Sequence, residues 1–343
     1  MTTPEQEAGR NPRPTETTGA TVAAEGTEAA EVVGGTEATE AAGGAGAAGA
    51  RHVTAAGGAP VAVPGPLVTP RWLGERLGTA GLVVLDASVG AHRDVGRRVP
   101  GARRFDIDGA LSDHDAPLPH TAPDAARFTE AVRDLGVDDT STVVVYDAAG
   151  LHSAARAWWM LRASGFDRVA VLDGGLPGWA AAGLPVEDGP PAAAAPVRGG
   201  FTARPREGWL VGSAAVAAAL ADPGAVVLDA RTRGRFAGTE PEPRGGLRGG
   251  HMPGAVNLPF GDLLDGAGRM RPPAELRELF APLVGEGSKR LLFSCGSGVT
   301  ACVLALGAEL SGYGDLAVYD GSWSEWGRPS DLPVVTGGAA PRP

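Results

Sequence analysis

Short apolar runs and longer amphipathic stretches alternate along most of this chain. The runs are four or five residues long and rich in valine, and they are apolar throughout rather than at every second position. That pattern is typical of strands buried on both faces of a parallel sheet. The intervening stretches have apolar residues at helical spacing, as at residues 124–135, 154–164 and 299–310. The alternation predicts an α/β fold in which helices flank parallel sheets.

An internal repeat divides this pattern into two halves. The sequence VVLDA occurs at residues 83–87 and again at 226–230, and three further landmarks follow in the same order in both halves. They are PGA at 100–102 and 253–255, the strands at 143–147 and 291–295, and the segments VLDGG and VYDGS, which begin at 171 and 318 and are each followed by a tryptophan. Landmarks kept in order across some 145 residues predict two similar domains in tandem.

Composition places the boundaries of these domains. Residues 1–63 are rich in Ala, Gly, Thr and Glu and contain no aromatic residue, so we expect a disordered tail there. A second stretch rich in proline and alanine, at 187–198, is typical of an extended linker. We therefore predict an N-terminal domain at 64–186 and a C-terminal domain at 199–343.

The charge pattern and the cysteine count narrow the class of protein. Eight Glu and three Arg of the tail account for about half of the net charge of −10, so the folded part is only mildly acidic and nothing indicates nucleic-acid binding. The chain shows neither a secretory signal nor an apolar stretch long enough to span a membrane, and its two cysteines cannot staple it, so we expect a cytoplasmic protein. We expect no metal and no cofactor, because the cysteines and the six histidines have no ligand spacing.

The segment SCGSGVTAC at residues 294–302 is the strongest candidate for chemistry. It follows an apolar strand, and ligands of parallel sheets bind beyond the carboxyl ends of strands. Gly296 and Gly298 can adopt backbone angles that other residues avoid, so the amides of the loop can turn toward one point, and a helix beginning near Val299 adds its positive end. Such a loop favours an anion, which predicts that Cys295 is a nucleophilic thiolate.

The other residues at corresponding positions have different expected roles. Asp147 stands in the first half where Cys295 stands in the second, so thiol chemistry is expected only in the C-terminal half. Cys302 lies on the apolar face of the following helix, where a buried small hydrophobic residue is the simpler reading. A phosphatase of the Cys-x5-Arg type would need an arginine where this chain has Ala301, which argues against phosphoryl transfer.

These motifs together resemble the two-domain rhodanese superfamily. The resemblance covers about residues 67–335 and rests on the tandem halves and on the segments GHMPGA, CGSGVTA and YDGSWSEW. The uncharged loop CGSGVTA resembles the 3-mercaptopyruvate sulfurtransferase branch, whereas thiosulfate sulfurtransferases typically carry basic residues after the cysteine. The resemblance implies transfer of sulfur from mercaptopyruvate to a thiol or cyanide through a persulfide on Cys295.

The resemblance also assigns roles to further residues. Arg235 and Arg244 would bind the carboxylate and keto groups of the substrate, a task that suits guanidinium groups. The proton relay of the family would comprise Ser297 with His120 and Asp108, and His114 competes with His120 for its place. The substrate would also contact the loop residues Gly296, Gly298, Val299 and Thr300.

Two alternative functions stay open at this point. The first is thiosulfate sulfurtransferase activity, and the second is a noncatalytic rhodanese module that only binds. The family suggests thioredoxin as a thiol acceptor.

Overall fold

The computed structural model describes residues 61–189, 196–285 and 287–338. The elements of the first half are β1 (Leu67–Val68), α1 (Pro70–Gly74), β2 (Leu82–Asp86), η1 (Gly90–His92), β3 (Arg97–Arg98), β4 (Arg103–Arg104), α2 (Ala125–Asp134), β5 (Thr142–Tyr146), α3 (Ala154–Ala163), β6 (Val169–Leu172), α4 (Gly175–Ala181) and β7 (Glu187–Asp188). Those of the second half are β8 (Leu210–Val211), α5 (Ser213–Ala221), β9 (Ala225–Asp229), α6 (Arg233–Ala237), β10 (Val256–Asn257), η2 (Phe260–Leu263), α7 (Pro273–Val284), β11 (Arg290–Ser294), α8 (Ala301–Leu310), β12 (Leu316–Tyr319) and α9 (Ser322–Trp326).

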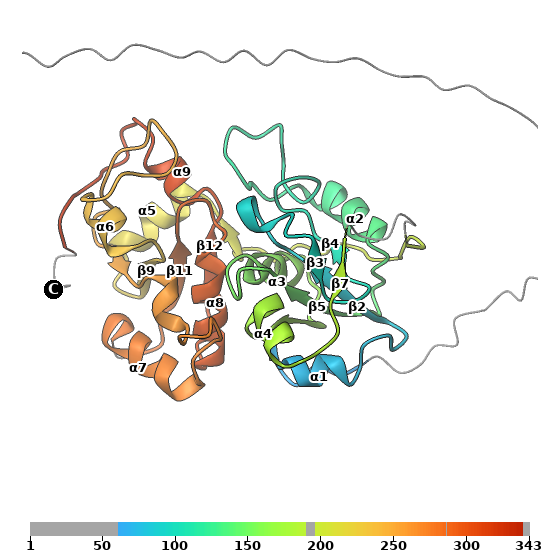
Figure 1. Ribbon diagram of the computed structural model, residues 1–343. Coiled ribbons are helices and arrows are strands. Elements are labelled where there is room, and N and C mark those ends of the chain that lie inside the picture. Colours follow the sequence, from blue (N-terminus) through green and yellow to red (C-terminus); the bar gives the residue numbers. More distant parts are fainter. Residues whose placement is uncertain (1–60, 190–195, 286, 339–343) are drawn as a thin grey trace, which may run out of the picture. The chain divides into compact units, whose positions relative to one another are not determined.

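Each half contains one five-stranded parallel sheet (Figure 1). The strand order is β1-β6-β5-β2-β4 in the first sheet and β8-β12-β11-β9-β10 in the second, which is the same topology. The central strands pair in matching register, with Leu82 opposite Thr142 in one sheet and Ala225 opposite Arg290 in the other. The predicted α/β fold with two tandem, similar domains is confirmed.

Side chains of successive strand residues enter different cores, as the pleat of a strand requires. In β5, Val143 and Val145 pack with α2 and α3, whereas Val144 and Tyr146 pack with α1 and α4. The second sheet repeats this division, with α7 and α8 on one face and α5, α6 and α9 on the other. Both faces of each sheet are therefore covered, which explains why the strands are apolar throughout.

A tryptophan anchors the last helix of each half in the same way. Trp179 of α4 and Trp326 of α9 are almost completely buried. Their indole N–H groups donate to backbone carbonyls a few residues further along, those of Pro185 at 2.6 Å and Pro333 at 2.8 Å. The repeat seen in the sequence thus extends to individual hydrogen bonds.

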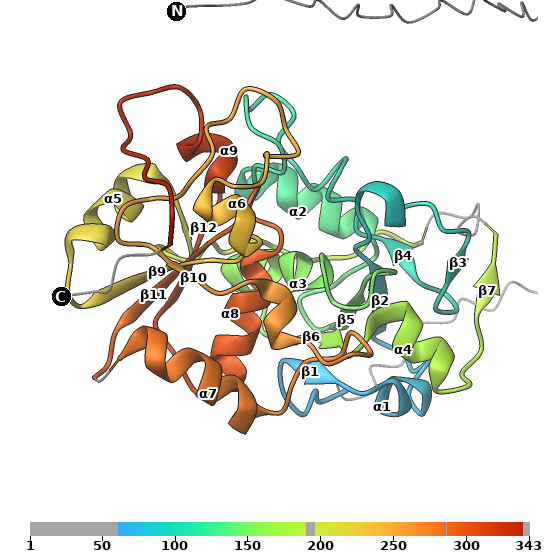
Figure 2. The same cartoon turned by 60° about the vertical axis from the view of Figure 1, so that its left-hand side comes forward.

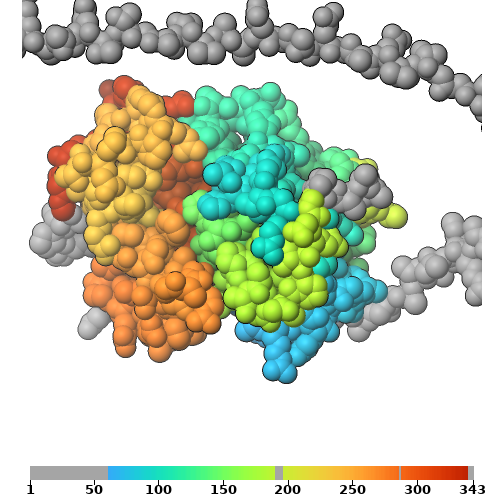
Figure 3. Space-filling view, viewed as in Figure 1, coloured from blue at the N-terminus to red at the C-terminus, as the bar shows by residue number. Residues whose placement is uncertain are grey.

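Helices α3 and α8 join the two halves. They lie next to each other between the sheets (Figures 1 and 2), and most residues of both helices are buried. One continuous hydrophobic core runs from the first sheet through these helices to the second. The space-filling view shows the blue-to-green first half against the yellow-to-red second half (Figure 3). This packing brings the carboxyl ends of β5 and β11 to one boundary, where residues from both halves meet.

The connecting segments have contacts that their composition does not reveal. Of the predicted linker, residues 190–195 lie outside the described residues, but β7 pairs antiparallel with β3. Phe201, in the first residues after the linker, is buried against Phe128 and Phe166 of the N-terminal half. A disordered tail is predicted for residues 1–63, and residues 1–60 lie outside the described part of the chain. Val63 packs against the core between the first sheet and helices α1 and α4.

Candidate active site

A cleft of about 370 Å³ opens between the two halves at the carboxyl ends of the strands. The loops after β2, β4 and β5 of the first half line one side of the cleft, and the segments after β9, β10 and β11 of the second half line the other. Its lining residues are Val89, Gly90, Asp108, His120, His152, Ala230, Arg231, Thr232, Arg235, Pro243, Arg244, Phe260, Cys295, Gly296, Ser297, Val299 and Thr300. Nine of the ten residues predicted for the site from the sequence line this cleft, and the tenth, Gly298, lies within the cysteine loop.

Cys295 lies directly after β11 and is only 2 % exposed. Helix α9 holds the backbone of Cys295 through two hydrogen bonds. The Cys295 N–H donates to the Ser322 hydroxyl at 3.1 Å, and the Cys295 carbonyl accepts from the Trp323 N–H at 3.0 Å. The Ser324 N–H and hydroxyl donate to the carbonyl of Gly296 at 2.9 and 2.7 Å. These bonds use carbonyls of the loop and the N–H of Cys295 and leave the other amides of the loop unpaired within the described residues.

The amides of the loop have no partner within the described residues. None of the backbone N–H groups of residues 296–300 donates a hydrogen bond to a described group. Helix α8 begins directly afterwards at Ala301 and adds the positive end of its dipole. A loop of free amides at a helix N-terminus stabilises negative charge, either on the sulfur of Cys295 or on a bound substrate.

The two glycines of the loop serve different purposes. Gly298 has φ 76°, and a Cβ there would meet the carbonyl oxygen of Asp320 at 2.7 Å, so this turn requires glycine. Gly296 does not have a positive φ, contrary to the expectation that both glycines would need unusual angles. A Cβ on Gly296 would instead meet the Arg235 guanidinium at 3.0 Å, so the missing side chain leaves room for that group.

Two arginines reach the loop from the segment after β9. Arg235 of α6 is held by Glu242, which accepts from its Nη2 at 2.5 Å and from its Nε at 3.2 and 3.3 Å. Arg244 is exposed and forms no hydrogen bond or ion pair with the described part of the chain, and its Nη1 lies 4.0 Å from the Cβ position of Gly296. One guanidinium is therefore fixed in place and the other is available to an anionic substrate.

Glu242 and Arg231 support this pair and were not identified from the sequence. Arg231 is fully buried, pairs with Asp229 at 2.6 Å and with Glu242 at 2.8 Å, and lies over the ring of Trp323 at 4.0 Å. Burial works against its charge, but the two carboxylates raise its pKa on balance. The DAR sequence after β9 contained this signal, since a buried strand-end Asp needs a cationic or hydroxyl partner.

Ser297, His120 and Asp108 form a hydrogen-bonded chain across the cleft. The His120 Nδ1 lies 2.9 Å from the Ser297 hydroxyl, its Nε2 lies 3.0 Å from Asp108 Oδ1, and the other Asp108 oxygen accepts from the Gly90 N–H at 2.8 Å. His120 adopts φ 59°, which is rare for a residue with a side chain. His114, the competing histidine, is exposed and contacts the carbonyl of Gly109 instead.

Burial lowers the pKa of His120, and Arg244 and Arg156 lower it further, while Asp108 acts in the opposite direction. The neutral imidazole is therefore favoured near neutral pH. With Nε2–H donating to the Asp108 carboxylate, Nδ1 is left to accept from the Ser297 hydroxyl. This arrangement lets a proton move between Ser297 and His120.

A buried arginine that the sequence did not reveal fixes the relay between the halves. Arg156 of α3 is fully buried and donates to the His120 carbonyl at 2.9 Å, to Asp320 at 2.5 Å and to the Gly298 carbonyl at 3.5 Å. Asp320 also accepts from the Ala122 N–H at 2.9 Å. One guanidinium thus ties the histidine of the first half to the cysteine loop of the second.

Cys302 lies outside the cleft. Its side chain is fully buried in α8, and its thiol donates to the Gly298 carbonyl at 3.3 Å. Burial raises the pKa of this thiol to about 12, although Arg156 works against the rise. Cys302 is therefore held as a protonated thiol within the core.

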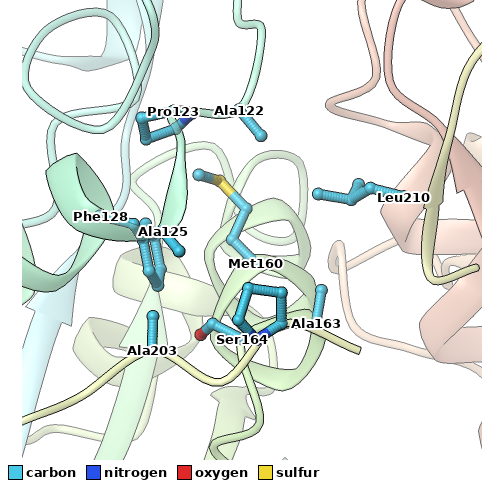
Figure 4. A pocket seen from close by; sticks show the side chains of 10 residues that line it. Ala122, Pro123, Ala125, Phe128, Met160, Ala163, Ser164, Ala203 and Leu210 are labelled. Carbon is cyan, nitrogen blue, oxygen red and sulfur yellow. The ribbon is translucent and has the colours of Figure 1, made fainter. Parts of the chain in front are cut away.

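A second pocket at the boundary differs in character from this cleft. It encloses about 80 Å³ among apolar side chains such as Phe128, Met160 and Leu210 (Figure 4). No ionisable side chain lines it, and the hydroxyl of Ser164 donates a hydrogen bond to the carbonyl of Leu161. In the described part of the chain no cluster of His, Cys, Asp and Glu is arranged to hold a metal ion, and no helix is long and apolar enough to cross a membrane.

Comparison with known proteins matches both halves to one family. The rhodanese-like domain model matches residues 69–182 and again 213–328. The chain is 43 % identical over 283 residues to human 3-mercaptopyruvate sulfurtransferase, covering 78 % of this chain and 94 % of the relative. It is 37 % identical over 297 residues to the mitochondrial thiosulfate/3-mercaptopyruvate sulfurtransferase 1 of Arabidopsis thaliana, covering 78 % of each chain.

A solved structure gives the same picture. The crystal structure of SseA from Escherichia coli, described as a 3-mercaptopyruvate sulfotransferase of rhodanese fold, superposes with a TM-score of 0.67 at 36 % identity, covering 76 % of this chain and 99 % of that one. Both halves, their shared topology and the relatives that span both halves agree, and the chain belongs to the rhodanese family as a tandem two-domain member.

Proposed function

We propose that this chain is a sulfurtransferase that takes the sulfur of 3-mercaptopyruvate onto Cys295 and passes it to a thiol or to cyanide, releasing pyruvate. The relatives named above include enzymes named for this substrate. The observation that carries the proposal is the arrangement around the cysteine loop. A nearly buried thiol precedes a loop of amides without a described partner, with a free guanidinium near the loop and a hydrogen-bonded Ser-His-Asp chain in the same cleft.

The first step is attack of the Cys295 thiolate on the substrate sulfur. A bond forms between the two sulfur atoms, the C3–S bond breaks, and its electron pair moves to C3 to give the enolate of pyruvate. The amides of residues 296–300 stabilise the negative charge before and after the transfer. The sulfur remains on Cys295 as a persulfide.

The enolate needs a proton, and the donor thiol supplies it. The proton of the substrate thiol moves by way of the Ser297 hydroxyl and His120 to C3, so that the methyl group of pyruvate is completed with no proton gained from outside. The 2.9 Å contact between Ser297 and His120 supports a relay through both groups, with Asp108 orienting the imidazole. The neutral form of His120, which its lowered pKa favours, is the form that can accept.

The arginines support a 2-oxo acid as the preferred donor. Arg244, free of ion pairs in the described residues, can bind the substrate carboxylate, and Arg235, held by Glu242, can donate to the keto oxygen and to the enolate that develops there. The loop itself has no charged side chain next to the sulfur, whereas thiosulfate is a compact dianion that would need one.

Thiosulfate remains the alternative donor, and the Arabidopsis relative reported above is named for both donors. The experiment is a single turnover with each donor at a stoichiometric amount. Pyruvate is quantified, and mass spectrometry of peptides locates one additional sulfur atom. We expect rapid pyruvate release and a modified Cys295 peptide with mercaptopyruvate, and slow transfer with thiosulfate. A preference for thiosulfate would overturn the donor assignment.

Two variants make the test specific to the proposed nucleophile. Cys295→Ser should form no adduct with either donor. Cys302→Ala should form the adduct normally, because the Cys302 thiol is buried and protonated. An adduct on Cys302 would contradict the proposed role of Cys295.

We also propose thioredoxin as an acceptor and the cytoplasm as the location. An assay that couples pyruvate release to thioredoxin oxidation tests the first, and cell fractionation tests the second.

A further inference from the structure

His152 is a titratable side chain in the cleft that the mechanism above does not use. It follows Asp147 in the loop between β5 and α3, and it lines the same cleft as Cys295. Its backbone N–H donates to the Asp147 carboxylate at 2.8 Å, which fixes the loop. Its ring packs edge-on against Phe260 of the second half, with the ring centres 5.5 Å apart. The side chain is therefore held in place by both halves.

The ring nitrogens of His152 are free to meet an incoming molecule. Neither forms a hydrogen bond or ion pair with the described part of the chain, and neither is among the buried polar atoms left without a partner. His120 differs in this respect, because both its ring nitrogens are occupied, by Ser297 and by Asp108. Of the two histidines in the cleft, only His152 offers a free lone pair.

The charges around His152 favour its neutral form. Burial lowers the pKa of His152, nearby Asp147 acts against this, and His92 adds to the lowering. The other ionisable groups that line the cleft are Asp108, His120, Arg231, Arg235, Arg244 and Cys295. A neutral imidazole with an open nitrogen is a competent general base near neutral pH.

The acceptor step of the reaction requires such a base. In the donor step the substrate brings its own proton, and the relay through Ser297 and His120 returns that proton to carbon. In the acceptor step a thiol must lose its proton before it can attack the persulfide, since the thiolate is the nucleophile.

We propose that His152 is a catalytic residue of the acceptor step, a conclusion that rests on the proposed function. His152 removes the proton of the acceptor thiol, and the resulting thiolate attacks the outer sulfur of the Cys295 persulfide. A new S–S bond forms on the acceptor, the S–S bond to Cys295 breaks, and its electron pair returns Cys295 to the thiolate. His152 then gives its proton to the acceptor persulfide or to water, so that atoms and charges balance.

The test separates the acceptor step from the donor step. The persulfide is loaded first, and its loss is then followed in a single turnover with either 2-mercaptoethanol or sulfite. Sulfite, at a pH where it is a dianion, attacks the outer sulfur without losing a proton. In His152→Gln, transfer to 2-mercaptoethanol should slow on the order of a hundredfold, whereas transfer to sulfite and pyruvate release in the donor step should stay near wild type.

The pH profile gives a second readout. Wild-type transfer to the thiol should rise with pH through the lowered pKa of His152 and then level off. The variant should instead follow the ionisation of the free thiol up to alkaline pH. His114→Gln, which replaces an exposed histidine outside the cleft, is the matched control and should keep wild-type rates.

Two outcomes overturn the proposal: an unchanged thiol rate in His152→Gln, or equal losses with thiol and sulfite, which would indicate a structural role. Failure of the donor assignment is distinguishable, because the persulfide can also be loaded with inorganic polysulfide. If mercaptopyruvate fails to load the protein, the proposed function fails while the test of His152 still proceeds.

Discussion

The loop after β5 in the first half and the loop after β11 in the second have the same place in their sheets but hold different groups. In the first, the carboxylate of Asp147 accepts four backbone N–H groups of its own loop: that of Ala149 at 3.0 Å and those of His152, Ser153 and Ala154 at 2.8 Å. In the second, Cys295 stands at the corresponding position, and the amides of residues 296–300 donate to no described group.

The difference shows how one backbone design serves two purposes. In the first loop the amides converge on Asp147, whereas those of residues 296–300 donate to no described group, and both loops lead into a helix N-terminus. With a carboxylate in that position the loop is internally satisfied and becomes a rigid wall. With a cysteine there, the same amides remain available to a thiolate, a persulfide or a substrate anion. The first half therefore supplies support and side chains to the cleft, and the second half supplies the chemistry.

Replacing the thiol with the carboxylate of the other loop should have the largest effect. In Cys295→Asp the new carboxylate should accept the free amides of residues 296–300, as Asp147 does in its own loop. We expect complete loss of sulfur transfer from every donor, because no thiolate remains. We also expect a melting temperature at or above that of Cys295→Ala, because charged acceptors satisfy amides well. Activity assays and thermal unfolding measure the two effects.

Cys295→Ala is the matched control, since it removes the thiol without adding an acceptor. A melting temperature of Cys295→Asp clearly below that of Cys295→Ala would show that the amides do not converge on residue 295. The comparison between the two loops would then be wrong, although the role of the thiol would stand.

Removing the carboxylate of Asp147 from the first loop should destabilise the protein. Asp147→Ala leaves four amides without their acceptor in a fully buried position. The free energy of unfolding should fall by about 2 to 4 kcal/mol, the range expected when a buried hydrogen-bond network loses its charged member. Urea denaturation measures this loss. Asp147→Asn, which keeps one acceptor oxygen, should lose less, and equal stability of all three proteins would contradict the account.

Local sequence patterns predicted the repeated features well. The landmark pairs show that β2 corresponds to β9, β5 to β11, and β6 to β12 in the repeat. Local patterns suffice for this because strands and glycine turns depend on residues within a few positions. The sequence also indicated the meeting of Ser297, His120 and Asp108, but only through resemblance to a family. Nothing in the residue spacing alone places two segments 177 residues apart at 2.9 Å.

The features that the sequence did not reveal are contacts between distant segments. Arg156 looks like one more residue of an amphipathic helix, yet its partner Asp320 lies 164 residues away. Glu242 reads as part of a polar loop, but it is buried between two arginines. The use of such residues depends on which faces the two domains bury against each other, and local propensity does not determine that.

A third prediction concerns the charge that the second loop lacks and the arginines supply. Arg244→Ala should lower kcat/KM for mercaptopyruvate about ten- to hundredfold, which corresponds to roughly 1.5 to 3 kcal/mol for one charge-assisted contact. The loss for thiosulfate should be smaller, because that donor has no carboxylate remote from its sulfur. Steady-state assays with both donors measure the ratio.

Arg244→Lys is the control for charge without geometry. It should recover part of the lost activity, since an ammonium group retains the charge but not the bidentate contact. An unchanged ratio of the two donors in Arg244→Ala would mean that this arginine does not read the carboxylate.

The smallest expected effect is a change in the titration of His120, which belongs to the first half but serves the second loop. Burial and the positive charge of Arg244 both lower the pKa of this imidazole, so its neutral form persists to lower pH than in a free histidine. Protonation would turn Nδ1 into a donor and end its ability to accept from Ser297. The donor step should accordingly be lost as pH falls through the lowered pKa and be present above it.

Removing Arg244 removes one of the lowering causes, so the pKa of His120 should rise and the acid limit of activity should move to higher pH. NMR titration of labelled histidines in the Cys295→Ser background, with His120→Gln to assign the signal, measures this directly without interference from the thiol. A His120 that titrates well above the ordinary histidine range would show that the imidazole is charged at rest, and the proton relay would have to run in the opposite direction.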